Sequence, residues 1–281
     1  MTRIVRTFSA QHFPSFKRAH STLARACLIR SVALRDHSTS DGGPLLTTKM
    51  HLRRAAPHRY FFIAFALLAA LLVATGFTRT FFLPLASGTF SRPWFVYVHG
   101  ILFFAWIALL VIQALLAIRR QLDWHRRLGW VGVAMIPLMT ASGVMVAYWA
   151  TRRDVAAGQG ADALAFFFGT LMDMLLFASL ATAAVIARRS SAAHKRLILL
   201  ATLAVLGAAV GRIPVVGAFA NYLTVFLILS IATLDVLTIR QVHRATLLGG
   251  AWLLIGIFTE TTIGNTNAWL SVAQRIVGNG H

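Results

Sequence analysis

The chain is poor in charged residues and nearly free of cysteine. Only 12% of its 281 residues are charged, whereas about 25% is usual in soluble globular domains. Its single cysteine, Cys27, excludes an internal disulfide and any metal or iron–sulfur site built on several cysteines. Hydrophobic residues make up 58% of the chain. This composition excludes an ordinary soluble domain and indicates an integral membrane protein in contact with a lipid bilayer.

Acidic residues are also scarce, with 8 Asp and Glu against 27 Lys and Arg, which gives a net charge of +19. In a soluble protein such an excess would indicate nucleic-acid binding. Here the cations are gathered in short segments between long apolar stretches. Basic loops of this kind determine how a protein is oriented in a membrane. We therefore expect no nucleic-acid partner.

Seven apolar stretches each approach the roughly 20 residues that a helix needs to cross the hydrocarbon core of a bilayer. They run over residues 60–77, 93–118, 128–150, 163–187, 195–216, 218–239 and 247–264. The sequence therefore predicts an all-α, polytopic membrane bundle of about seven transmembrane helices within residues 50–264. Residues 265–281 carry apolar side chains at helical spacing among polar ones, and this predicts a short interfacial C-terminal helix or tail.

Residues 1–49 differ from the rest of the chain. They are basic, contain scattered Ser and Thr, and have Asp36 and Asp41 as their only acids. This composition is typical of a targeting segment. The alternative is that translation begins at Met50 and that the upstream part is a disordered tail outside the mature protein. The second interpretation is favoured because basic residues follow Met50 directly and precede the first apolar stretch.

A basic motif occurs twice between apolar stretches. It consists of two arginines, four further residues, then His, two basic residues and Leu, and it begins at Arg119 and again at Arg188. The repeat predicts a repeated helix-pair unit. Loops on one side of the predicted membrane carry thirteen Lys and Arg residues, and those on the other side carry five. This bias predicts a bacterial cytoplasmic (inner) membrane protein with the mature N-terminus inside and the C-terminus outside.

Ionisable residues are rare inside the apolar stretches. The expected members of one outer-facing polar cluster are Asp173, Arg212 and Glu260, with His99 near the same face. Because a charge costs about 2.5–3.5 kcal/mol at the centre of a membrane helix, such residues indicate function. Arg212 could bind an anion, or the two acids could relay a proton or cation. The alternative is a structural network in which Arg212 pairs with Glu260 or Asp173.

Asp235 is a separate case, because it lies near the opposite end of its apolar stretch. Arg240 follows it within the same loop region. We expect Asp235 to form a local ion pair or a helix cap there.

The second apolar stretch carries five polar and large apolar residues on one helical face. They are His99, Phe103, Trp106, Leu110 and Gln113. His99 and Gln113 are about 21 Å apart along the helix axis. Two histidines at this separation can ligate two haems in multi-span b-type cytochromes, but glutamine is a poor haem ligand, so a two-haem scheme on this helix alone fails. A single haem could instead be held by His125 and His194, the histidines of the basic motif. The alternative is that both belong to interfacial basic loops that face lipid phosphate.

Together these residues resemble a group of bacterial multi-span membrane proteins of unassigned activity. The elements that carry the resemblance are Val98-His99-Gly100, Trp106, Gln113, His125-Arg126-Arg127-Leu128-Gly129, Asp173-Met174, His194-Lys195-Arg196-Leu197 and Gly211-Arg212-Ile213-Pro214. The chain resembles cytochrome b561-like bundles more distantly, and that resemblance implies haem b as a cofactor with His99, His125 and His194 as candidate ligands. Gln113 departs from a paired-histidine pattern.

Three functions follow as hypotheses for this integral membrane protein. The first is haem-linked electron transfer, with His125 and His194 as inner ligands and His99 at an outer haem, quinone or other small-molecule site. The second is a proton- or solute-coupled transporter that uses the three residues of the outer polar cluster. The third is a non-catalytic assembly or scaffold protein in which the buried charges are structural. The sequence names no substrate and does not decide whether the protein is an enzyme.

Overall fold

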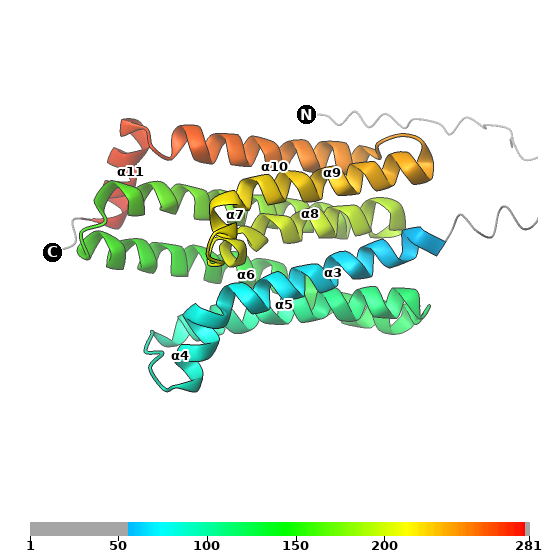
Figure 1. The fold of residues 1–281 in the computed structure, drawn as a ribbon, viewed down its shortest axis with the longest axis horizontal. Helices are drawn as coiled ribbons and strands as arrows, with labels where there is room; N and C mark the ends of the chain where they lie inside the picture. Colours follow the sequence, from blue (N-terminus) through cyan, green and yellow to red (C-terminus); the bar gives the residue numbers. More distant parts are fainter. Residues whose placement is uncertain (1–55, 279–281) are drawn as a thin grey trace, which may run out of the picture. The chain divides into compact units, whose positions relative to one another are not determined.

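The computed structural model describes residues 56–278, which form helices joined by turns and loops, with no β-strand among them (Figure 1). Among these residues, seven helices are long and apolar enough to cross a membrane. They are α3 (Ala56–Phe77), α5 (Trp94–Ile118), α6 (Leu122–Ala156), α7 (Gly160–Ile186), α8 (Ser191–Val210), α9 (Ala220–Ile239) and α10 (Arg244–Ile263). This confirms the predicted all-α membrane fold. The predicted basic segment 1–49 lies outside the described residues.

Shorter elements connect or follow these helices. A π-helix (Thr78–Phe82) and α4 (Leu83–Ala86) continue from α3, and two 3₁₀ turns (Ala187–Arg189 and Val216–Phe219) precede α8 and α9. Two predicted stretches differ from the structure in length. The third is a longer helix than 128–150, and the fifth ends at Val210, so the turn to α9 is longer than the sequence predicted.

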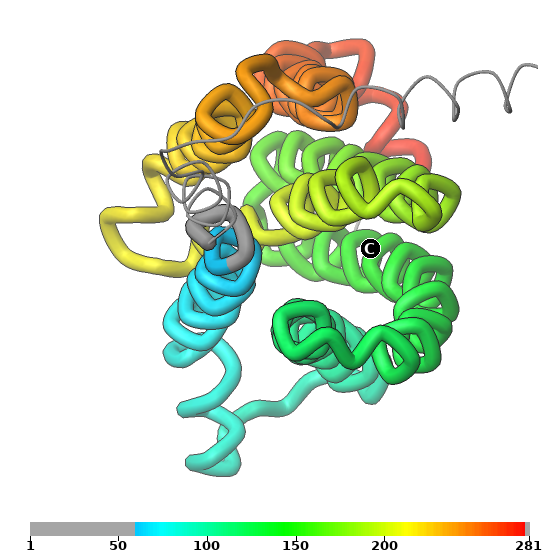
Figure 2. The backbone as a smooth tube through the Cα atoms, turned by 90° about the vertical axis from the view of Figure 1, so that its right-hand side faces the viewer, coloured from blue at the N-terminus to red at the C-terminus, as the bar shows by residue number. Residues whose placement is uncertain are grey.

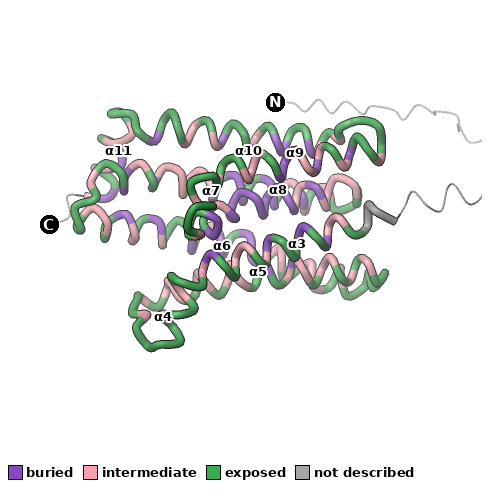
Figure 3. Tube along the Cα trace, in the orientation of Figure 1, coloured by how far each residue is buried: buried purple, intermediate pink, exposed green. Residues whose placement is uncertain are grey.

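The helices from α5 to α8 pack against one another in chain order, and α3 packs against both α5 and α8. Figures 1 and 2 show α9 and α10 on one side of the bundle and α5 on the opposite side. Helix α8 lies between them and is the most buried of the long helices, as the purple segments of Figure 3 show. Its residues Leu200, Ala201 and Thr202 are completely buried. Helix α8 is therefore the centre around which the other helices are held.

Close approach of α3 to α8 depends on one glycine. A Cβ atom at Gly76 would overlap the main-chain carbonyl oxygen of Ala209 and lie 2.8 Å from its carbonyl carbon. Small residues at such crossings allow two membrane helices to pack at short range, where van der Waals contact replaces the hydrophobic effect as the attraction between helices. Gly76 therefore allows the end of α3 to rest on the end of α8.

The predicted C-terminal helix is α11 (Asn267–Val277). Thr266 caps it, because its side-chain oxygen accepts a hydrogen bond from the backbone N–H of Trp269 at 3.3 Å. The indole Nε1 of Trp269 donates to the carbonyl oxygen of Leu164 in α7 at 2.8 Å. On the packed side of α11, Ala273 and Val277 are buried. These contacts hold α11 against the ends of α6 and α7.

Candidate functional site

The two copies of the basic motif occupy equivalent places in two helix pairs. The first copy joins α5 to α6, and the second joins α7 to α8. In each copy the histidine is the fourth residue of the second helix, namely His125 in α6 and His194 in α8. The structure brings these two imidazoles together, with ring centroids 6.4 Å apart and ring planes at 83°. We refer to them as the histidine pair.

Each imidazole is oriented by a backbone carbonyl of the preceding helix. His194 Nδ1 lies 2.8 Å from the carbonyl oxygen of Ala184, and His125 Nδ1 lies 3.4 Å from that of Gln113. A carbonyl oxygen only accepts hydrogen bonds, so each Nδ1 carries the proton. The lone pair of each ring is then on Nε2, which is the arrangement of a histidine that binds a metal.

Gln113, the residue found where a paired-histidine pattern would have a second histidine, is hydrogen-bonded to His125. Its side-chain Nε2 donates to the carbonyl oxygen of His125 at 3.1 Å, so side chain and backbone of the two residues are joined reciprocally across the α5–α6 turn. Its Oε1 is buried and has no hydrogen-bond partner within the part of the chain that the structure describes. A buried acceptor without a donor costs about 1–3 kcal/mol. A ligand or ordered water that donates to Oε1 would remove this cost.

A cavity of about 230 Å³ adjoins the histidine pair and Gln113. Its walls come from α3, α5, α6 and α8 and are mostly apolar, with Phe62 and Leu110 among them. Lys195 also lines the cavity, and its Nζ lies 4.4 Å from the ring centroid of Phe62. The site thus combines three polar acceptors with apolar walls and one cation.

His99 lies apart from the histidine pair. It is 14 residues before Gln113 on α5, about 21 Å along the helix axis. Its ring is 4.3 Å from that of Phe103, and its Nδ1 is 3.5 Å from Ser142 Oγ on α6. Of the three histidines expected as haem ligands, the structure therefore brings together His125 and His194 and leaves His99 near the other end of α5.

The expected outer cluster is divided into two parts. The carboxyl group of Glu260 in α10 packs on Gly169 in α7, with its Cδ 3.7 Å from the position of a Cβ there. Asp173 is one helical turn further along α7 and close enough to Glu260 to interact with it electrostatically. Arg212 is joined to neither acid by an ion pair between described residues. It donates to the carbonyl oxygen of Ala208, and its guanidinium carbon lies 4.7 Å from the ring centroid of Phe77.

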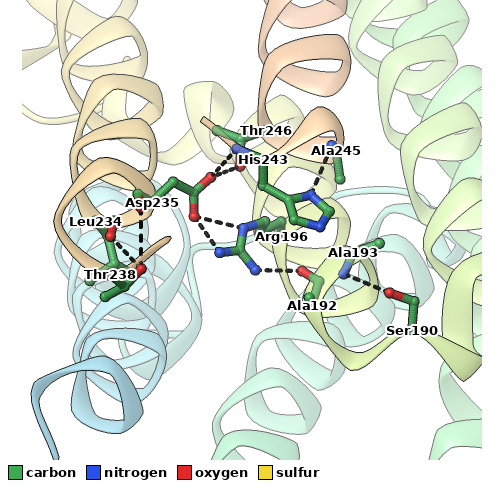
Figure 4. Close-up of polar contacts among 10 residues, drawn as sticks. All are labelled: Ser190, Ala192, Ala193, Arg196, Leu234, Asp235, Thr238, His243, Ala245 and Thr246. Carbon is green, nitrogen blue, oxygen red and sulfur yellow. Dashed lines mark hydrogen bonds and ion pairs between the residues drawn. The ribbon is translucent and has the colours of Figure 1, made fainter. Parts of the chain in front are cut away.

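A second polar network lies on the side of α8 that faces α9 and α10 (Figure 4). Arg196 Nε donates to Asp235 Oδ1 at 2.8 Å, and Arg196 Nη2 contacts the same oxygen. Asp235 Oδ2 accepts from Thr246 Oγ1 at 2.6 Å and from the backbone N–H of His243 at 3.1 Å. Arg196 and Asp235 are both buried, with exposed fractions of 1% and 0%. The ion pair joins α8 to α9, and the hydrogen bond from Thr246 extends the network to α10.

The predicted local ion pair of Asp235 with Arg240 is wrong. Arg240 ends α9 with a left-handed φ of 63°, and the ion-pair partner of Asp235 is Arg196, from α8. Packing of α9 on α8 selects this distant partner. The expected cap is present in a different form, because Asp235 accepts the backbone N–H of the residue that precedes α10.

His243 lies in the turn between α9 and α10 and is the N-cap residue of α10. Its Nδ1 accepts a hydrogen bond from the backbone N–H of Ala245 at 3.0 Å. Partial burial, and after it the positive charge of Arg196, lower the pKa of His243 from its ordinary value of 6.5. The cap therefore requires the neutral form of this imidazole.

The structure is that of an integral, multi-span membrane protein in contact with the lipid bilayer, with seven candidate membrane helices within residues 56–278. The chain matches no known family, no curated protein and no solved structure. Among the described residues no group of three or more His, Cys, Asp or Glu side chains could hold a metal ion without further ligands. A metal at the histidine pair would therefore need ligands of its own.

Proposed function

We propose that the protein is a membrane electron-transfer protein in which His125 and His194 would together hold one haem b. The observation that carries this proposal is the histidine pair, in which each Nδ1 lies against a backbone carbonyl and the lone pair of each ring is therefore on Nε2. A porphyrin supplies the remaining iron ligands, so two histidines are sufficient. The distant resemblance to cytochrome b561-like bundles is in agreement with this proposal.

The separation of the two rings fits one metal ion between them. Two imidazoles that each placed one nitrogen about 2.0 Å from the same metal ion would have their ring centroids at most roughly 6.3 Å apart. The centroids of the histidine pair are 6.4 Å apart. Direct hydrogen bonding between the two rings would need a shorter separation, because a typical N···N distance is about 3 Å. The pair therefore has the spacing of two ligands that share one metal.

The surroundings of the pair fit a tetrapyrrole in composition. The walls of the 230 Å³ cavity are mostly apolar, and Lys195 supplies a positive charge suited to a propionate. This volume lies just below the range of about 300–1,000 Å³ for small-molecule pockets, so a tetrapyrrole would extend beyond the cavity. Bound haem supplies one-electron transfer; the chain orients the two ligands through Gln113 and Ala184 and excludes water with its apolar walls.

The membrane and orientation belong to the same proposal. We place the protein in a bacterial cytoplasmic membrane with the histidine pair at the inner face, because the two copies of its motif carry eight of the thirteen basic residues on the more basic side. Electrons would then be exchanged with a carrier at that face, and a quinone is a suitable class of carrier in a membrane.

The test is a reduced-minus-oxidised visible spectrum of the protein purified in detergent from haem-replete cells, with iron measured in the same sample. A stoichiometric b-type band that disappears in His125→Ala and His194→Ala is expected. His99→Ala is the matched control and should keep the band, because its ring lies apart from the pair. A folded protein without haem and iron would overturn the proposal.

A second function has an observation of its own in Asp173 and Glu260. Two acids interact across α7 and α10 within the membrane-spanning part, and no ion pair with a cation joins either of them among the described residues. Such a pair suits the uptake and release of a proton or cation during coupled transport. Proton uptake into proteoliposomes that is lost in Asp173→Asn and Glu260→Gln, and kept in His125→Ala, would support transport. Unchanged proton flux in Asp173→Asn and Glu260→Gln would exclude transport by these two acids.

A further inference from the structure

A second cavity lies between α5 and α6, at the end of the bundle opposite the histidine pair. Its volume is about 420 Å³, and it is lined by Phe95, Met145, Tyr148, Trp149, Arg152 and Arg153. Four of these six residues are aromatic or apolar and two are cationic. The rings of Phe95 and Trp149 meet edge to face at 5.9 Å and join the two helices there.

We refer to this second cavity as the groove. Its two arginines differ in their partners. Arg153 is neutralised by Asp154, with Nε and Nη2 both 2.7 Å from Oδ1. Arg152 has no carboxylate partner within the part of the chain that the structure describes, and its guanidinium carbon lies 5.9 Å from the ring centroid of Tyr148. The groove thus has one uncompensated positive charge beside an apolar wall.

The depth of Arg152 is suited to a lipid headgroup. Arg152 and His125 both lie on α6, 27 residues apart, which corresponds to about 40 Å along the helix axis. A bilayer with its headgroup regions is about 40–45 Å thick. With one end of α6 at one headgroup region, Arg152 lies at the other. Met145 lies closer to the hydrocarbon because it is seven residues, about two helical turns, further inside α6 than Arg152.

We infer that this groove binds one anionic phospholipid, with its phosphate on Arg152 and the upper part of an acyl chain against Phe95, Met145 and Trp149. The charge of Arg152 selects an anionic headgroup over a zwitterionic one, and the aromatic wall selects a lipid over a free anion. This inference is independent of haem binding.

The experiment uses the full chain reconstituted in bilayers of phosphatidylglycerol and phosphatidylcholine in equal amounts, then extracted and examined by native mass spectrometry. One retained phosphatidylglycerol per protein is expected. Arg152→Gln should weaken its retention about tenfold, the effect of losing one charged hydrogen bond of roughly 1.4 kcal/mol. Arg79→Gln removes the same charge at the same end of the bundle but outside the groove, and should leave retention unchanged.

One further variant and one ligand separate the alternatives. Trp149→Leu should weaken retention while Arg152 is intact, because the acyl chain loses its wall. Equal retention of phosphatidylcholine, or equal loss in Arg79→Gln and Arg152→Gln, would overturn the inference by showing no selection by this arginine. Glycerol phosphate, which has the anionic group without acyl chains, should not displace the lipid at millimolar concentration. Displacement at that concentration would show a site for small anions and would also overturn it.

Discussion

Removal of the carboxylate of Asp235 should destabilise the protein more than removal of any exposed acid. In Asp235→Ala the guanidinium of Arg196, which is 1% exposed, loses its anionic partner, and Thr246 Oγ1 and the His243 N–H lose their acceptor. Breaking one partner of a buried pair costs about 3–5 kcal/mol because a buried charge is left uncompensated. This corresponds to a change of roughly 10²–10³·⁵ in the unfolding equilibrium.

The chain contains a matched control for this effect. Asp123 and Arg126 form an ion pair at 3.5 Å with side chains 88% and 73% exposed. Exposed pairs contribute about 0–1 kcal/mol, so Asp123→Ala should change stability little. The assay is thermal unfolding of detergent-purified variants, followed by size-exclusion chromatography after heating, with chemical denaturation for the free energy.

A double variant tests the reasoning itself. Replacing both partners, as in Arg196→Met with Asp235→Leu, removes both buried charges together and should recover a large part of the loss. If Asp235→Ala and Asp123→Ala destabilise the protein equally, or if the double variant is no better than Asp235→Ala alone, the loss does not come from an uncompensated charge. Either result would refute the argument from burial.

The remaining predictions concern packing and pH. Gly76→Ala should lower the unfolding temperature, because the added methyl group would overlap the carbonyl of Ala209. Gly207→Ala is the control and should not lower it, because no atom lies within 4 Å of its Cβ position. Thermal unfolding of the two variants checks this, and equal effects would exclude the overlap as the cause. The lowered pKa of His243 means that the unfolded chain binds more protons there. Stability from this cap should therefore be present above about pH 6.5 and decrease as the pH falls below it. His243→Asn keeps a capping oxygen without a titratable ring and should flatten this pH dependence between pH 7.5 and 5.5; an unchanged slope would assign it to another group.

The positions of the membrane-spanning helices could be predicted from the sequence because each is a long apolar run between polar loops. The second predicted stretch, 93–118, corresponds to α5 at Trp94–Ile118. The third was predicted too short because hydropathy follows the hydrocarbon core, whereas α6 continues as a helix through basic residues on both sides of it. Hydropathy therefore indicates what lies in lipid, and hydrogen bonding decides where a helix ends.

The partners of polar side chains could be predicted only in part. The periodicity of α5 assigned Gln113 to a helical face but not to a neighbour, so its bond to the backbone of His125 was not foreseen. Asp235 was assigned to the cation nearest in sequence, whereas its partner is 39 residues away. A pattern within one helix gives the direction of a side chain around that helix. Its partner depends on which helices pack together, and the single chain holds no direct signal of that packing.

The histidine pair is the exception, and the internal repeat explains why. The same motif begins the second helix of each helix pair, and each imidazole lies against a carbonyl near the end of the preceding helix, 12 residues earlier for His125 and 10 residues earlier for His194. Two equivalent helix pairs that pack side by side, with α6 against α7 and α7 against α8, bring equivalent positions to the same end of the bundle. His125 and His194 therefore lie close together because the motif is repeated and the two helix pairs that carry it pack side by side. If the repeat exists to hold one shared ligand, exchanging the two motifs, with residues 119–128 and 188–197 transposed, should preserve the haem spectrum more fully than replacing either histidine alone.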